Sequence, residues 1–258
     1  MKIFKDLYQY RELLKTNVRK EIRGKYKGSF LGVLWSFINP LLMVLVYAIV
    51  FPLILKSSEP NYVIFLIVGI IPWNFFTTVI NQGTTTIVNN GNIIKKVYFP
   101  REILPISVVT SGLINFFISC IIILIFIIFG GMSLSLVMLL LPLITLIQYI
   151  LSLGIIFILS AINVYIRDIE YIVNFIVMML FYPTPILYSS ELFANTAFEW
   201  IMNINPMAHI INAYRDIFYY QVLPDFSILA IVGIISFVIL IVGYQIFKKL
   251  EKRFAEEL

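Results

Sequence analysis

The sequence contains little charge. Of its 258 residues, 13% are Asp, Glu, Lys or Arg and 60% are hydrophobic, whereas a soluble domain is about half apolar and about a quarter charged. A water-soluble core has no room for so many apolar side chains, so the composition excludes an ordinary soluble domain. It predicts a protein embedded in a lipid bilayer.

The sequence also lacks the residues that most catalytic and metal sites need. Cys120 is the single cysteine, so no disulfide can form within the chain, and its place in an Ile/Phe run predicts a small buried hydrophobic side chain. His209 is the single histidine and is expected to be structural. The stretch "RGKY" at residues 23–26 lacks the glycine spacing and the Ser or Thr of a nucleotide-binding loop. We therefore expect no catalytic residue, no metal ligand and no cofactor held by this chain.

Long apolar runs divide the chain. A helix needs roughly 20 apolar residues to cross a bilayer, and six runs meet this need: residues 30–55, 62–88, 103–129, 134–166, 169–187 and 226–247. The fourth run is longer than a bilayer requires, so it must tilt, kink at Pro142 or protrude. Only Arg167 and Asp168 separate the fourth run from the fifth, which predicts a tight turn. The predicted fold class is an all-α membrane protein with six transmembrane helices.

The basic residues predict the orientation, because cytoplasmic loops of membrane proteins carry an excess of Lys and Arg. With both termini in the cytoplasm, only Lys56 and Arg215 of the 19 Lys and Arg residues lie on the outer side. The positive charge thus belongs to the cytoplasmic membrane surface and does not indicate nucleic-acid binding. Hardly any ionisable residue lies near mid-membrane, which argues against an ion-coupled transporter. Energy for transport would have to come from a partner.

Residues 1–28 form the first predicted domain, a cytoplasmic helix at the membrane interface, and residues 29–258 form the six-helix transmembrane domain. From residue 7 to residue 26, apolar side chains recur at every fourth position while Arg and Lys occupy the other faces. This pattern predicts a helix in the headgroup plane, with its basic face toward anionic membrane lipid. The apolar stripe consists of Tyr10, Leu14, Val18, Ile22 and Tyr26.

A compact basic loop, residues 89–102, joins the second and third runs and reads "NNGNIIKKVYFPRE". It predicts a short helix over about residues 93–99, ended by Pro100. The two lysines are expected to face water or lipid phosphate, and the apolar residues 97–99 suggest a docking surface. The residues alone leave a second interpretation open, an interfacial turn anchored by aromatic and Lys side chains.

Residues 188–225 form the other long connection and lie on the outer side. They contain two short apolar stretches around "NINP", neither of which is long enough to cross the membrane. Backbone that enters a membrane without crossing it must be sheltered by protein. The pattern therefore predicts a re-entrant helix pair that dips into the outer leaflet.

Aromatic residues make up 16% of the chain, and many lie in the spans or at their ends. Any one of them is typical of the aromatic belt at a membrane surface. Together they also suit a path for glycans, because aromatic faces pack against the C–H faces of sugars while tyrosine hydroxyls hydrogen-bond to sugar hydroxyls.

Three stretches resemble the membrane subunits of type-2 ABC exporters that move polysaccharides. They are "RGKYKGSFLGVLWSFINPLL" (residues 23–42), "GIIPWNFFTTVINQGTTTIVNNGNIIKKVYFPREILP" (residues 69–105) and "NPMAHIINAYRD" (residues 205–216). The resemblance covers nearly the whole chain. The Trp-containing start of the first span and the Phe-Pro-Arg-Glu run are its specific parts, whereas the spans are not.

The resemblance implies a permease that exports O-antigen, teichoic acid or capsular glycan across the cytoplasmic (inner) membrane of a bacterium or archaeon. Such permeases act as homodimers with two copies of a separate ATPase subunit, which binds ATP and Mg, and the substrate is a lipid-linked glycan. The loop after the second span would then be the coupling helix that sits in a cleft of the ATPase. Its contact or hinge residues would be Ile93, Lys95, Lys96, Phe99, Pro100, Arg101 and Glu102.

The resemblance also implies a channel at the dimer interface and an outer gate. The aromatic residues expected to line the channel are Trp35, Tyr47, Trp73, Phe76, Phe181, Tyr182 and Tyr188. The residues expected at the gate are Asn205, Pro206 and Arg215.

Two alternatives to a polysaccharide-exporting permease can be distinguished by sequence features. A type-2 ABC permease for drugs or lipids would match the Trp-containing start less well and would have a less aromatic channel. A membrane-embedded enzyme of envelope synthesis would need carboxylates or histidines clustered at one membrane face. At the inner face this chain offers only Asp168 and Glu170 beside Arg167, which is typical of a turn with a local ion pair.

Overall fold

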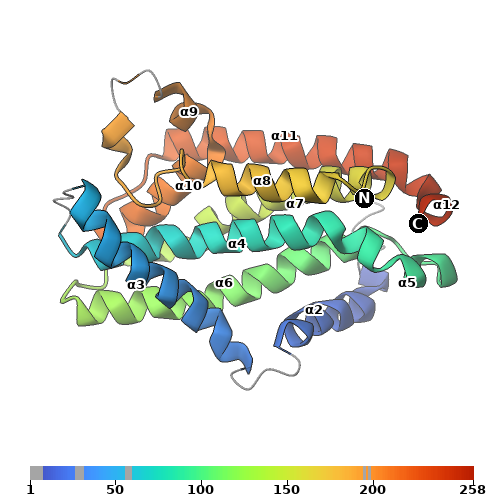
Figure 1. Cartoon of the computed structure of the whole chain (residues 1–258), viewed down its shortest axis with the longest axis horizontal. Coiled ribbons are helices and arrows are strands. Elements are labelled where there is room, and N and C mark those ends of the chain that lie inside the picture. The colour runs from blue at the N-terminus through green and yellow to red at the C-terminus, as the bar shows by residue number, and fades with distance from the viewer. Residues whose placement is uncertain (1–7, 27–31, 56–59, 194–195, 197–198) are drawn as a thin grey trace.

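The computed structural model describes residues 8–26, 32–55, 60–193, 196 and 199–258, and every regular element within these ranges is helical. Figure 1 shows α4, α6, α7 and α11 running alongside one another, with α5 and α12 together at one end of the bundle. The helices are α2 (Arg11–Tyr26), α3 (Trp35–Leu55), α4 (Tyr62–Asn89), α5 (Gly91–Lys96), α6 (Ile103–Phe129), α7 (Leu141–Tyr165), α8 (Ile169–Leu180), α9 (Glu199–Ile204), α10 (Pro206–Arg215), α11 (Phe226–Leu250) and α12 (Phe254–Glu257).

Four helical stretches of the described chain are long and apolar enough to cross a membrane: residues 62–96, 103–129, 136–165 and 226–257. In the most apolar part of each stretch, 78% of the residues are buried in the stretch that contains α4, but only 22% in the stretch that contains α11. Helix α4 therefore forms the centre of the bundle, and α11 turns most of its apolar surface outward. Exposed apolar helices of this kind need lipid around them. The predicted class, an all-α integral membrane protein, is confirmed.

The other two predicted spans are shorter as helices. Residues 30–55 give α3, whose described apolar stretch runs over residues 38–51. Residues 169–187 give α8, which has 12 residues. At about 1.5 Å per residue this is about 18 Å, less than the roughly 30 Å of a bilayer's hydrocarbon core. Helix α8 ends just before Pro183 and Pro185, which lack the N–H groups that a continuing helix requires. Six spans stay a prediction.

Pro142 begins a helix and does not kink one. Residues 136–140 form a 3-10 turn, and α7 starts at Leu141, so Pro142 lies in the first helical turn. A missing N–H has no cost there, because the first N–H groups of a helix have no partner within it. The tight turn expected at Arg167 and Asp168 is observed between α7 and α8.

Helices α7 and α11 pack closely through a pair of glycines. A Cβ added to Gly154 would lie only 2.7 Å from the backbone nitrogen of Leu240, and one added to Gly243 would meet the Gly154 carbonyl. Small residues at such positions let membrane helices approach each other closely. The two helices therefore pack as one unit along the length of the bundle.

Polar side chains in the middle of the bundle bond to one another. The Tyr214 hydroxyl lies 2.9 Å from Gln148 Oε1 and 3.0 Å from Thr145 Oγ1, and Gln148 Nε2 donates to the carbonyl oxygen of Pro72 at 2.8 Å. All three side chains are buried. These three side chains thus satisfy one another's polar groups, as a low-dielectric interior favours.

Candidate functional site

The coupling segment, residues 89–102, connects α4 with α6 and contains the short helix α5. The helix starts at Gly91 and ends at Lys96, whereas the sequence predicted residues 93–99. Beyond it Val97 is extended, with φ −131° and ψ 134°. The early end has a physical reason, since Phe99 precedes Pro100 and a residue before proline is disfavoured in the helical conformation.

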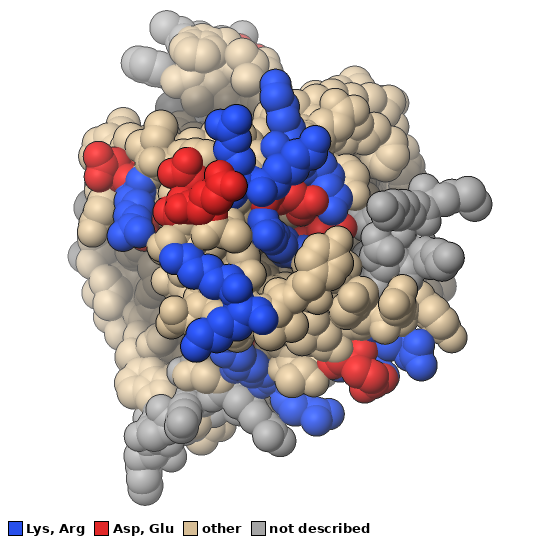
Figure 2. All heavy atoms as spheres, turned by 90° about the vertical axis from the view of Figure 1, so that its right-hand side faces the viewer, with Lys and Arg blue, Asp and Glu red and all other residues tan. Residues whose placement is uncertain are grey.

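The predicted coupling residues divide into an exposed group and a buried group. Ile93, Lys95 and Lys96 are exposed, whereas Phe99 and Glu102 are buried, and Pro100 and Arg101 are half-buried between them. The exposed group is continued by two side chains that were not among the predicted contacts, Val97 at 56% exposed and Tyr98 at 92%. Figure 2 looks onto this end of the molecule and shows Lys and Arg side chains gathered over it. An apolar, basic surface is therefore presented to the solvent here.

The buried group is tied to the C-terminal end by ion pairs. The two carboxylate oxygens of Glu102, a residue with no exposed surface, lie 2.9 and 3.0 Å from Lys248 Nζ. The same ammonium group donates to Glu251 Oε1 at 2.9 Å. Arg101 donates to the backbone carbonyl oxygen of Glu251. Residues 101–102 at the start of α6 are therefore fastened to the end of α11, and we call this contact the C-terminal clamp.

Aromatic packing extends the clamp to α7. The centroid of the buried Phe254 ring lies 5.6 Å from that of Phe247 and 6.4 Å from that of Tyr165. The guanidinium carbon of Arg101 lies 5.8 Å from the same Phe254 centroid. The Tyr165 hydroxyl donates to the Leu250 carbonyl oxygen at 2.8 Å. Movement of the coupling segment would therefore act on α6, α7 and α11 together.

Helix α2 lies against the other side of the coupling segment. Its predicted apolar stripe is half-buried at Tyr10, Leu14, Val18 and Ile22 and packs toward α6, while Arg11, Lys15, Arg19 and Lys20 are exposed. The side chain of Tyr26 lies outside the described part of the chain. Lys20 Nζ donates to Asn90 Oδ1 at 3.0 Å, so α2 contacts the residue where α4 gives way to α5. The amphipathic pattern is confirmed, and its contact with lipid stays a prediction.

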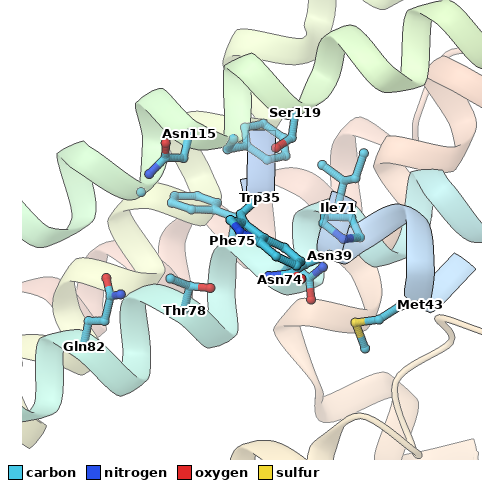
Figure 3. Close-up of a pocket in the computed structure, with 13 residues that line it drawn as sticks. Trp35, Asn39, Met43, Ile71, Asn74, Phe75, Thr78, Gln82, Asn115 and Ser119 are labelled. Carbon is cyan, nitrogen blue, oxygen red and sulfur yellow. The ribbon is translucent and has the colours of Figure 1, made fainter. Parts of the chain in front are cut away.

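A polar hollow of about 430 Å³ opens between α3, α4 and α6. Figure 3 shows Asn74, Thr78 and Gln82 in a row along α4, with Asn115 and Ser119 reaching in from α6. Helix α3 supplies Asn39 beside Trp35. The hollow contains no charged side chain from the described chain. Its lining consists of Trp35, Asn39, Pro40, Met43, Ile71, Asn74, Phe75, Thr78, Gln82, Gly112, Asn115, Phe116 and Ser119.

Most of the predicted channel aromatics form one cluster that joins α3, α4 and α8. The Phe181 ring centroid lies 6.0 Å from those of Tyr47 and Trp73 and 5.6 Å from that of Tyr182. Trp73 continues the cluster to Phe76 at 5.6 Å. Of the other two predicted residues, Trp35 lies in the polar hollow, and the Tyr188 hydroxyl donates to the Tyr182 carbonyl. The structure brings these residues together, and their role in a channel stays a prediction.

The predicted gate residues hold the turn that follows α8. Arg215 is 1% exposed and donates to the carbonyl oxygens of Ile186 at 2.7 Å and Tyr188 at 3.2 Å, and its guanidinium carbon lies 3.5 Å from the Phe65 ring centroid. Asn205 donates to Thr184 Oγ1 at 2.9 Å.

Two short helices, α9 and α10, lie where the sequence predicts a re-entrant pair, and their entry into a membrane stays a prediction. Asn205 accepts from the Met207 N–H at 3.0 Å and so caps α10, which has Pro206 as its first residue and is 10 residues long. This is too short to cross a membrane. The side chains of α10 that are buried against the bundle include Ile210, Ile211 and Tyr214.

Asp216 follows α10 and lines one recess together with Asp225. Burial first, and then the negative charge of Asp225, raise the pKa of the Asp216 carboxyl to about 6. Asp225 accepts from the Ser227 N–H at 2.8 Å and caps α11. His209 and Asn212 line the same small recess of about 70 Å³. The recess therefore contains a carboxyl group whose pKa is raised above its ordinary value.

Comparison with known proteins identifies the family. The sequence profile described as ABC-2 type transporter matches residues 12–219. The chain belongs to the ABC-2 type transporter family. It is 36% identical to the O-antigen export system permease protein RfbA of Myxococcus xanthus over 259 residues, which covers 100% of both chains. Two proteins of the same name from Klebsiella pneumoniae are 38% and 37% identical over 246 residues, with 95% of this chain and 94% of each relative covered.

Because the chain belongs to a transporter family, the coupling segment and the polar hollow are candidates for roles in transport. The clamp and the hollow were not found from the sequence. Glu102 and Lys248 are 146 residues apart in the chain, so their contact is not apparent from the sequence. Their opposite charges, at the predicted cytoplasmic ends of two predicted spans, could have indicated an ion pair. The hollow had a signal as well, since residues 74, 78 and 82 place polar side chains one helical turn apart in an otherwise apolar span.

Proposed function

We propose that this protein is the membrane-spanning permease of an ATP-driven exporter that moves lipid-linked polysaccharide across the cytoplasmic membrane. The observation that carries the proposal is the similarity to three O-antigen export permeases, which extends over nearly the whole of each chain. Similarity of this extent includes the connections as well as the predicted spans.

The coupling segment supports the proposal that energy enters from a separate ATPase subunit. Its exposed side chains, Ile93, Lys95, Lys96, Val97 and Tyr98, offer apolar area together with positive charge, which suits a groove with acidic edges on a partner. Its buried side chains connect this surface to α6, α7 and α11. ATP and Mg would be bound by the partner, and motion of α5 would select between two packings of the bundle.

The assembly is part of the proposal. The permease would cross the membrane six times, with both termini in the cytoplasm and the basic end of Figure 2 facing the ATPase. Two permeases and two ATPase subunits would form the transporter. The amide-lined hollow favours a glycan over an apolar drug or lipid, because its polar groups would lose their hydration to an apolar ligand without replacement.

Tyr98 provides the sharpest test of the coupling surface. We expect Tyr98→Ala to weaken binding of the ATPase subunit on the order of 30-fold, because an exposed aromatic anchor at an interface is worth about 2 kcal/mol. Tyr171→Ala is the matched control, since Tyr171 is 69% exposed at the start of α8. Binding would be measured between the detergent-purified permease and its ATPase subunit. Equal affinities for the two variants would contradict the proposed role of α5.

A further inference from the structure

Buried polar atoms without a hydrogen-bond partner occur at several places in the described bundle, such as Asn81 Oδ1 and Asn163 Oδ1, and one of them, Asn115 Oδ1, lines the hollow. Gln148 and Tyr214 bond to protein neighbours within the core. In contrast, no hydrogen bond joins the six polar side chains of the hollow to any other described side chain or backbone group, and the buried Asn115 Oδ1 has no partner in the described chain. An amide without a hydrogen bond in an apolar medium costs about 2 kcal/mol or more. These groups therefore need a partner from outside the fold.

The hollow lies about halfway along a helix that is long and apolar enough to cross a membrane. Asn74 lies 12 residues from the start of α4 and 15 from its end, or about 18 Å and 22 Å along the helix axis. This is the middle of a membrane-crossing helix. Three polar side chains spaced by four residues lie on one face of a helix, so the face of α4 toward α3 and α6 is hydrophilic at mid-membrane depth.

The polar face of α4 leads from the hollow to the coupling segment. Thr85 and Asn89 follow Gln82 at helical spacing, and Asn89 Nδ2 donates to Thr85 Oγ1 at 3.1 Å. Gln82 and Asn89 are both exposed. A ligand in the hollow would therefore lie on the same helix face that ends at α5, where we propose that the ATPase acts.

The chemistry of the lining selects a class of ligand. Amide and hydroxyl groups both donate and accept hydrogen bonds, as sugar hydroxyls do. Trp35, Phe75 and Phe116 add apolar faces to the same lining, and the volume of about 430 Å³ lies within the range of small-molecule sites. The lining contributes no Lys, Arg or His, so nothing in it would neutralise a phosphate or a carboxylate.

We infer that the polar hollow is a binding site for uncharged sugar units, and that it selects neutral glycans over polymers whose repeating units carry phosphate. The inference rests on the proposed exporter function and adds the substrate class to it. The charged lipid pyrophosphate of the substrate would stay at the basic cytoplasmic end, and only the sugar chain would enter the hollow.

The test uses the complete permease–ATPase complex in lipid nanodiscs and the double variant Gln82→Leu, Asn115→Leu. Two probes are compared, a lipid-linked oligosaccharide of neutral hexoses and a lipid-linked glycerol-phosphate polymer of similar length. Turnover with each probe is expressed relative to turnover without it. The matched control is Gln245→Leu, Asn174→Leu, in which both replaced side chains are exposed on α11 and α8 and lie outside the hollow.

We expect the neutral oligosaccharide to stimulate the wild-type complex and the control, and the hollow variant to need at least a tenfold higher concentration for half-maximal stimulation. Loss of two hydrogen bonds of about 1 kcal/mol each corresponds to such a change. The melting temperature of the hollow variant should not fall, because the replaced groups bond to nothing in the fold. A purely structural role would lower it.

A second measurement reads binding directly. In a variant that retains Trp35 as its only tryptophan, Trp73→Phe, Trp200→Phe, the neutral oligosaccharide should change the indole fluorescence and the phosphate polymer should not. If glycan stimulates turnover but the hollow variant matches its control, or if the phosphate polymer is preferred, the inference is overturned and the exporter function stands. If neither probe stimulates any complex, the exporter function fails and the inference falls with it.

Discussion

Replacing Lys248 by Met removes the cation that neutralises a fully buried carboxylate. Both oxygens of Glu102 lie within 3.0 Å of the Lys248 ammonium group, and Glu102 has no exposed surface. Breaking a buried ion pair from one side costs roughly 3–5 kcal/mol, since the other charge is left uncompensated. The Lys248 side chain is 34% exposed, so water screens part of the loss, and we expect about 3 kcal/mol.

At about 2–4 °C per kcal/mol for a chain of this size, Lys248→Met should lower the apparent melting temperature in detergent by about 6–12 °C. Lys249→Met is the matched control, because Lys249 is exposed and forms no ion pair in the described chain. Adding Glu102→Gln to Lys248→Met should restore most of the lost melting temperature, because no buried carboxylate is then left without a cation. A Lys248→Met protein as stable as the Lys249→Met control, or a double variant that recovers nothing, would refute this account of the clamp.

Two further predictions concern the outer side. A Cβ on Gly69 would lie 3.0 Å from the Ile186 carbonyl oxygen, so Gly69→Val should displace the turn after α8 and lower the free energy of unfolding by about 1–3 kcal/mol. The control Gly233→Val should lower it less, because a Cβ on Gly233 would have no neighbour nearer than 3.8 Å. Equal melting temperatures of the two variants would contradict the packing described. Burial and the charge of Asp225 raise the pKa of Asp216 to about 6, whereas an Asp in an unfolded chain has a pKa of roughly 4. Between these two pH values the folded state binds a proton that the unfolded state does not. The free energy of unfolding should therefore fall as pH rises from about 4 to about 6. Asp216→Asn should flatten this dependence in thermal unfolding, and an unchanged slope would contradict its assignment to Asp216.

The positions of several helices follow from the sequence because their limits are local. The predicted runs 62–88, 103–129 and 226–247 correspond closely to α4, α6 and α11, since each apolar run is bounded by polar, proline or charged residues that do not belong in hydrocarbon. The length of α8 was harder to predict. Hydropathy continues through residue 187, but Pro183 and Pro185 end the helix before the apolar run ends.

The contacts that define the candidate sites could not be read from the sequence because they join distant residues. Residues 93–102 were expected to act as one surface, yet Phe99 and Glu102 face the bundle while Tyr98 faces the solvent. That division depends on where α11 ends relative to α6. The hollow depends in the same way on how α3 packs against α4 and α6, which a pattern of apolar residues does not specify. Three of the predicted channel aromatics, Tyr47, Trp73 and Phe181, lie near one another, and their place in a channel stays a prediction.

The arrangement gives a physical route from ATP to glycan. The ATPase would push on the exposed side of α5, and the clamp would pass this force to α6, α7 and α11. Helix α4 forms a wall of the polar hollow and ends at α5. A rotation of α4 would therefore move the amide groups relative to α3, so sugar contacts could be made and released as the coupling segment moves.

The central claim is tested most directly by transport itself. Permease and ATPase subunit would be reconstituted together in vesicles with the ATPase outside, and a lipid-linked oligosaccharide of neutral hexoses would be added to the outer leaflet. The account predicts ATP-dependent appearance of the oligosaccharide in the vesicle lumen, protected from an added glycosidase, with the wild-type permease and not with Tyr98→Ala. Protection that is equal with and without ATP, or equal for the two permeases, would contradict it.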